Sequence, residues 1–283
     1  MKNENAALHI PRIVKQFKLT PRKNLGQNFL TDENILKRII DIAEITPKDN
    51  VLEIGAGLGS LTRLLCKQAS HVTTIEIDER FIPILQDILS PYNNCNIIHG
   101  NILKIYPEEI IRTEDYVVVA NIPYYITSAL IRHLLEAEKK PKRIILTIQY
   151  EVAKRLCASS NKMSLLALSV QIYGTPTLIQ KIKPGAFYPR PKVDSAVIRI
   201  DLFENPLIEV ELMDLFFDLA RSGFGKKRKT LANSLSSGMG TNKNEIRSLL
   251  SNLGIDPRRR AETLSIAEWK TITQQWNSAF HHT

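Results

Sequence analysis

The chain has 283 residues, 43% of them hydrophobic and 24% charged, and no apolar run approaches the ~20 residues of a membrane span, so we expect a soluble protein with one large and one small domain. The amino-terminal residues lack the apolar core of a signal peptide, and the three cysteines, Cys66, Cys95 and Cys157, form no CxxC pair. These features predict a cytoplasmic protein with no metal site and no membrane contact. Thirty-eight Lys and Arg against 29 Asp and Glu give a net charge of +9, which suggests a polyanionic partner, although many basic proteins bind no nucleic acid.

Strand and helix patterns alternate along the first two thirds of the chain. Residues 1–30 are basic and irregular, because Pro11, Pro21 and Gly26 interrupt any long helix. Asp32 is a predicted N-cap for a helix over 33–45. Strands are predicted at 50–55, 72–77, 96–100, 116–121 and 143–149, with helices at 60–69, 79–89 and 128–138. This alternation predicts a doubly wound α/β sheet with right-handed crossovers. Two further strands, at 178–183 and 194–202, are expected to be adjacent and antiparallel at the sheet edge.

After residue 205 the pattern changes to helices alone. Helical spacing covers 209–222, 229–236, 244–254 and 265–276, and Ser265 with Glu268 forms a capping box for the last helix. We therefore predict a large domain over 1–205, with a basic amino-terminal loop, and a small all-α domain over 206–283.

A glycine-rich turn follows the first strand of the alternating region. Gly55, Gly57 and Gly59 follow a GxGxG spacing, and Ser60 stands where a dinucleotide motif would need its third glycine. Glu76 ends the next strand, where a carboxylate can accept hydrogen bonds from both ribose hydroxyls. The missing glycine favours a cofactor without a pyrophosphate, and S-adenosylmethionine is one. Asn101, after the third strand, lies where the adenine of such a cofactor usually sits.

The sequence NIPYY at 121–125 follows a run of valines typical of a doubly buried strand. Asn121 is thereby delivered to the crevice of the sheet, at the reactive end of the cofactor. The side-chain oxygen of Asn121 and the main-chain carbonyl of Ile122 can hold the two hydrogens of an exocyclic amine such as adenine N6. Pro123 stiffens this turn, and Tyr124 offers a face on which an extruded base can stack.

Several segments together resemble the ribosomal RNA adenine N6-dimethyltransferases, and among them the bacterial small-subunit enzymes. The resemblance is carried by LGQNFL at 25–30, LEIGAGLGSLT at 52–62, IEID at 75–78, NIPYYI at 121–126, FYPRPKVDSAV at 187–197, FGKKRKTLANSL at 224–235 and GIDPRRRAETLS at 254–265. It covers nearly the whole chain. It implies that the cofactor-binding residues are Asn28, Leu30, Gly55, Gly57, Glu76, Asn101 and Asn121.

The resemblance also implies that Phe187 faces Tyr124 across the flipped adenine, although an aromatic residue before a proline-rich turn often packs in a core. The family commonly has Asp where this chain has Asn101; an amide oxygen can still accept a hydrogen bond there. The basic clusters at 21–24 and 225–229 suggest RNA contacts through Arg22, Lys23, Lys226, Lys227, Arg228 and Lys229.

The function that the resemblance implies is dimethylation of two adjacent adenines in the 3′-terminal hairpin of small-subunit rRNA. The substrate would be an immature small subunit at a late stage of assembly, and we expect the enzyme to be a monomer. Three alternatives stay open. They are a resistance-type methyltransferase of large-subunit rRNA, a non-catalytic ribosome-assembly factor, and a nicotinamide-dependent oxidoreductase, which has no use for NIPYY.

Overall fold

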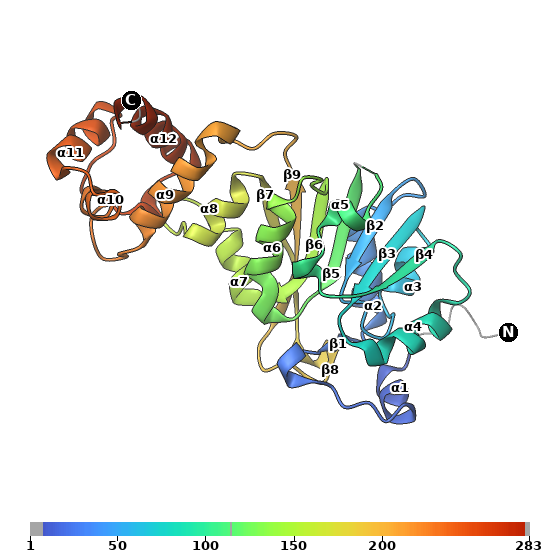
Figure 1. Cartoon of the computed structure of the whole chain (residues 1–283). Coiled ribbons are helices and arrows are strands. Elements are labelled where there is room, and N and C mark those ends of the chain that lie inside the picture. Colours follow the sequence, from blue (N-terminus) through green and yellow to red (C-terminus); the bar gives the residue numbers. More distant parts are fainter. Residues whose placement is uncertain (1–7, 114, 281–283) are drawn as a thin grey trace. The chain divides into compact units, whose positions relative to one another are not determined.

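The computed structural model describes residues 8–113 and 115–280, and the chain divides into two compact units (Figure 1). The first, called here the sheet unit, takes in the described residues up to Ala153 together with Pro176–Leu202. The second, called here the helical unit, takes in Lys154–Thr175 and the residues from Phe203 onwards. The sequence placed one boundary near residue 205 and assigned 154–175 to the large domain, whereas in the structure that segment groups with the later helices.

The sheet unit is built on a seven-stranded sheet, counted within the described residues, with the order β4-β3-β2-β5-β6-β9-β7. Its strands are β2 (Asn50–Ile54), β3 (His71–Glu76), β4 (Cys95–His99), β5 (Tyr116–Asn121), β6 (Arg143–Gln149), β7 (Gly174–Ile182) and β9 (Ser195–Leu202). The pairs β2–β3, β2–β5, β3–β4 and β5–β6 are parallel, and β9 runs antiparallel to β6. The predicted doubly wound sheet is confirmed, and β7 and β9 are neighbours as expected.

Helices flank both faces of this sheet (Figure 1). They are α2 (Glu33–Ala43), α3 (Thr62–Cys66), α4 (Ile82–Leu89), α5 (Pro107–Ile110), α6 (Thr127–Glu136) and α7 (Tyr150–Leu156), preceded by α1 (Ile10–Gln16). Asp32 caps α2 as predicted, because its side chain accepts from the backbone N–H groups of Asn34 and Ile35. The sequence did not predict α1, in which Pro11 occupies the first turn, where its missing N–H breaks no helical bond.

The amino-terminal segment is fastened to the sheet unit by a two-residue antiparallel pairing. Strand β1 (Phe29–Leu30) pairs with β8 (Phe187–Tyr188), with Phe29 opposite Tyr188 and Leu30 opposite Phe187. The pairing is extended by Thr31, whose backbone N–H donates to the carbonyl of Ala186 at 2.9 Å. The chain before α2 is thereby held beside the carboxyl ends of the parallel strands.

The helical unit contains α8 (Leu165–Gln171), α9 (Met213–Phe224), α10 (Leu231–Met239), α11 (Lys243–Asn252) and α12 (Ile266–Phe280). The helices predicted after residue 205 are present, and the capping box of α12 is formed: Ser265 N–H donates to Glu268 Oε2 at 2.7 Å and Glu268 N–H to Ser265 Oγ at 3.2 Å. Its core holds Trp269, which approaches Gly223 so closely that a Cβ there would lie 2.6 Å from the indole. Within the described ranges, no helix is long and apolar enough to cross a membrane.

Candidate functional site

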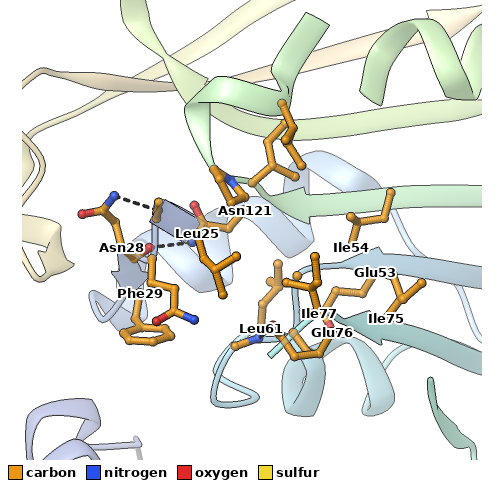
Figure 2. Close-up of a pocket in the computed structure, with 18 of the residues that line it drawn as sticks. Leu25, Asn28, Phe29, Glu53, Ile54, Leu61, Ile75, Glu76, Ile77 and Asn121 are labelled. Carbon is orange, nitrogen blue, oxygen red and sulfur yellow. Dashed lines mark hydrogen bonds between the residues drawn. The ribbon is translucent and has the colours of Figure 1, made fainter. Parts of the chain in front are cut away.

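A pocket opens where the parallel strands end, with a cavity volume of about 190 Å³ (Figure 2). Strand order reverses between β2 and β5, and the crevice at such a reversal is where open α/β sheets bind ligands. The predicted cofactor and base-binding residues all line this pocket: Asn28, Leu30, Gly55, Gly57, Glu76, Asn101, Asn121, Ile122, Tyr124 and Phe187. Residues from five separate segments of the sequence therefore meet around one cavity.

The glycine turn wraps around the carboxylate of Glu76. Gly57 N–H donates to Glu76 Oε2 at 2.7 Å, and Asp78 N–H donates to Oε1 at 2.8 Å. Glu76 is 5% exposed, and burial raises the pKa of its carboxyl group. Gly57 has φ +56°, and a Cβ there would lie 3.1 Å from the ring of Phe29, so the turn needs glycine for both its backbone and its neighbour. The carboxylate is thus oriented by backbone donors and keeps free lone pairs on the pocket side.

Asn121 is oriented by a residue from the amino-terminal segment. Its Nδ2 donates to the main-chain carbonyl of Asn28 at 3.1 Å, and Asn28 Nδ2 donates to the carbonyl of Gly26 at 3.0 Å (Figure 2). With its NH2 group engaged, Asn121 presents Oδ1 as the remaining polar atom, an acceptor. The sequence predicted both asparagines near the cofactor but gave no sign that the carbonyl of one holds the amide of the other.

Tyr124 is fixed at its hydroxyl by a residue that sequence reasoning missed. The hydroxyl oxygens of Tyr124 and Ser195 lie 2.6 Å apart, and Ser195, at the start of β9, is fully buried. Burial raises the pKa of the Tyr124 phenol. The ring therefore lines the pocket with its far end tied to β9, which limits its rotation.

Phe187 lies both in the pocket wall and in the core. It is 3% exposed and belongs to a hydrophobic cluster with Leu30 and Leu36. The sequence left a stacking role and a core role open for this ring, and the structure gives it contacts of both kinds.

Asn101 caps a short 3-10 turn that begins just after β4. Its Oδ1 accepts from Leu103 N–H at 3.0 Å, and its residue also lines the pocket. The opposite amide orientation would set NH2 against that N–H group, so the backbone donor selects the amide orientation. Asn101 consequently presents a donor, in addition to any remaining lone pair of Oδ1, to whatever lies beside it.

Glu53, on β2, is a second carboxyl group in the pocket wall that sequence reasoning missed. It is 1% exposed, and burial raises its pKa to about 7, with a further upward effect from the nearby Glu76. Thr74 Oγ1 donates to Glu53 Oε2 at 2.7 Å. The acid at the second position of LEIGAG was the only available signal, and it does not distinguish a pocket residue from a surface one.

The described lining of the pocket contains no Lys, Arg or His, and its ionisable acids are Glu53 and Glu76. A lining of this kind disfavours a pyrophosphate and suits a ligand that carries positive charge. No group of three or more His, Cys, Asp or Glu among the described residues could hold a metal ion.

A second hollow, of about 590 Å³, lies among residues at the opposite ends of the strands, including Asn50, His71 and Asn96. It is the larger of the two volumes. None of the residues predicted to bind a ligand lines it, and in open α/β sheets ligands bind at the carboxyl ends of the strands. We therefore assign the functional site to the first pocket.

The predicted RNA-binding residues fall into two groups. Arg22 Nη1 lies 3.7 Å from Asp78 Oδ1 in the sheet unit, and the side chain of Lys23 lies outside the described part of the chain. The other group is exposed in the turn that precedes α10 and comprises Lys226, Lys227, Arg228 and Lys229. Lys226 Nζ donates to Ser237 Oγ at 2.8 Å, so at least one of these cations has a local partner.

Comparison with known proteins gives consistent matches. The family model described as "Ribosomal RNA adenine dimethylase" matches residues 18–277. A Dehalococcoides mccartyi protein named "Ribosomal RNA small subunit methyltransferase A" is 46% identical over 266 residues, covering 93% of this chain and 91% of the relative. A Clostridium botulinum protein of the same name is 43% identical over 269 residues, covering 94% of this chain and 98% of the relative.

Two solved structures are similar over most of the chain. A dimethyladenosine transferase from Plasmodium falciparum has a TM-score of 0.78 at 28% identity, covering 88% of this chain and 98% of that chain. The 23S rRNA methyltransferase ErmE has a TM-score of 0.72 at 27% identity, covering 87% and 98%.

Proposed function

Because the chain belongs to the ribosomal RNA adenine dimethylase family, we propose that it transfers methyl groups from S-adenosylmethionine to N6 of two adjacent adenines in the 3′-terminal hairpin of small-subunit rRNA. The observation that carries this proposal is the oriented amide of Asn121, which ends β5 beside a carboxylate-lined pocket. An acceptor aimed at an exocyclic amine is what adenine N6 chemistry requires.

The pocket fits S-adenosylmethionine in its shape and in its charge. Glu76 is held by backbone donors in a position to accept from ribose hydroxyls, and the glycine turn at Gly55–Gly57 has no side chain that would exclude a ligand's backbone-like methionine part. Acidic groups and no basic ones line the described wall, which favours a cation. When bound, S-adenosylmethionine supplies an electrophilic methyl group on a positively charged sulfur.

Asn121 and Ile122 act on the incoming amine. The lone pair of adenine N6 is delocalised into the ring, so the free amine is a poor nucleophile. Asn121 Oδ1 and the Ile122 carbonyl accept its two hydrogens, favour a pyramidal nitrogen and direct its lone pair at the methyl carbon. The new N–C bond forms as the S–C bond breaks, and the cationic product amine then releases a proton to water. The contribution of these residues is positioning and electrostatic complementarity.

Tyr124 and Phe187 are the groups we propose to hold the base. The target adenine must leave its helix to reach the pocket, and stacking on an aromatic face recovers ~1–3 kcal/mol per base. Tyr124 suits this role because its hydroxyl is tied to Ser195, so little ring rotation is lost on binding.

The choice of small-subunit rRNA rests on the curated relatives, which carry that substrate in their names. The second candidate is large-subunit rRNA, favoured by the similarity to ErmE. We propose further that the substrate is an immature small subunit, that the helical unit with its basic residues before α10 binds RNA, and that the protein acts as a monomer in the cytoplasm.

The experiment that tests the proposal offers immature small subunits, mature subunits, large subunits and naked rRNA to the protein with labelled S-adenosylmethionine, and then maps the modified nucleosides. Two adjacent dimethyladenines in small-subunit rRNA support it. Label confined to large-subunit rRNA would establish the alternative, and binding without label would identify a non-catalytic factor.

Asn121→Ala should reduce transfer at saturating cofactor by roughly 10²–10³-fold, the typical cost of losing one positioned polar group, ~2.7–4 kcal/mol. Asn93→Ala, at an exposed asparagine, is the matched control.

A further inference from the structure

We propose that Gln27 and Asp78 are positioning residues for the transfer reaction, because they hold the amino-terminal segment where the Asn28 carbonyl sets the orientation of the Asn121 amide. This inference rests on the proposed role of Asn121. It assigns to the segment Gly26–Asn28 a task beyond covering the cofactor. The observations that carry it are a chain of contacts from a buried carboxylate to the reacting group.

The chain of contacts begins at Asp78, which is 1% exposed. Gln27 Nε2 donates to Asp78 Oδ2 at 2.7 Å, and Arg80 donates to both carboxylate oxygens, through Nε at 2.8 Å and Nη2 at 2.6 Å. The Arg80 hydrogen bonds lower the pKa of Asp78 to about 2, so the carboxylate stays charged at neutral pH. Gln27 uses its other end as well, since its Oε1 accepts from Arg22 N–H at 2.7 Å. The Gln27 side chain therefore pins the segment to the loop after β3.

The next part of the chain packs directly against the loop that follows Asn121. Gly26 has φ +60°, and a Cβ there would lie 2.9 Å from Cβ of Pro123. The absence of a side chain lets the two backbones approach. On its other side the segment is fixed by the pairing of β1 with β8. Gly26–Asn28 is thus a short span held at both ends, lying across the turn that carries the reacting amide.

The final contact decides which atom Asn121 presents. Its Nδ2 donates to the Asn28 carbonyl at 3.1 Å. If the amide were rotated by half a turn, Oδ1 would face that carbonyl oxygen, and two acceptors would repel each other. The carbonyl therefore selects the orientation in which Oδ1 is left for adenine N6. A segment displaced by even an ångström would lose this selection, and such displacements in active sites are costly.

The test uses full-length protein carrying Gln27→Glu, which replaces the donor to Asp78 by a second carboxylate. We expect turnover at saturating cofactor and RNA to fall by roughly ten- to a hundredfold, the fold-change that follows from leaving a buried polar partner unpaired. The dissociation constant for S-adenosylmethionine alone, measured by calorimetry, should change much less. Gln27→Met, which keeps the length of the side chain without its amide, is a milder second variant, and Gln16→Glu, at an exposed glutamine of α1, is the matched control.

A reversed pair gives the rescue. In Gln27→Glu/Asp78→Asn the pair again has one carboxylate and one amide, with the donor on the other residue, and turnover should recover most of the loss. Normal turnover of Gln27→Glu with weakened cofactor binding would mean that the segment is only a cofactor lid. A lowered unfolding temperature with normal turnover would mean a structural role alone. Either result overturns the proposal.

A double-mutant cycle separates this inference from the proposed function. In the Asn121→Ala background, Gln27→Glu should cause no further loss of turnover, because the amide that it positions is gone. Equal losses in both backgrounds would overturn the positioning role and leave the proposed function intact. Wild-type transfer by Asn121→Ala itself would overturn the role of Asn121, and this inference with it.

Discussion

The buried carboxyl group of Glu53 should make the stability of the sheet unit fall as the pH rises through neutrality. Its pKa is raised from 4.5 to about 7 by burial, so the folded state binds a proton that the unfolded state has already released between these two values. Stability from this group is then fully present below about pH 4.5 and is lost as the pH rises through about 7. A pKa difference of this size corresponds to about 3 kcal/mol.

Glu53→Gln isolates this effect, because glutamine keeps an acceptor for Thr74 Oγ1 and cannot ionise. The variant and the wild type should have similar free energies of unfolding at pH 5. At pH 8 the variant should be more stable, by up to about 3 kcal/mol. Glu138→Gln, the same change at an exposed carboxylate, controls for the altered net charge.

The assay must report on the sheet unit. Both tryptophans of the chain, Trp269 and Trp276, lie in α12 of the helical unit, so their fluorescence follows the other unit. Hydrogen exchange of the amides of β2 in cofactor-free protein reports the opening of the strand that carries Glu53. If the difference between variant and wild type is the same at pH 5 and pH 8, then Glu53 is ionised in the folded state and the reasoning is refuted.

Three further predictions concern the cofactor, the base and the RNA. Glu76→Ala should chiefly weaken S-adenosylmethionine binding, whereas Tyr124→Ala should leave cofactor affinity almost unchanged and slow transfer; equal losses in calorimetric titrations would contradict the assignment. Asn101→Asp keeps the cap on Leu103 N–H and adds a charged acceptor, so cofactor binding should tighten modestly, and a fall in calorimetric affinity would mean that the NH2 group of Asn101 is the one used. Replacing the three lysines before α10 by Gln should flatten the salt dependence of RNA binding by about one to three units, near 0.9 per phosphate, without changing cofactor affinity; an unchanged slope would make these residues surface charges only: Lys226, Lys227 and Lys229.

The sheet and the side chains at its strand ends could be predicted from sequence because both depend on local patterns. The run at 143–149 was assigned within its bounds as β6, since buried parallel strands are continuous apolar segments. Asn121 and Glu76 follow such runs directly, so their placement at one edge follows from the parallel arrangement itself.

Contacts between distant segments could not be predicted in this way. Strand β1 has two residues, too few for any periodicity, and exists only through its pairing with β8. Ser195 is an ordinary strand residue until the fold brings its hydroxyl to Tyr124. The segment 154–175 has local helical signals, but its membership of the helical unit depends on tertiary contacts such as the bond from Met163 N–H to the Glu262 carbonyl, 3.1 Å long.

The way in which Asn121 is held has a consequence for how the activity depends on the fold. Its amide is oriented by a residue 93 positions earlier in the chain, and Tyr124 by a residue 71 positions later. Neither partner belongs to the parallel strands that form the core of the sheet. The reacting geometry is therefore completed by the amino-terminal segment and by β9, after the strands that carry the reacting residues have paired. Substitutions that loosen either partner should reduce transfer while leaving the sheet folded and the cofactor pocket in place, because the interactions that stabilise the core and those that align the amine are made by different residues.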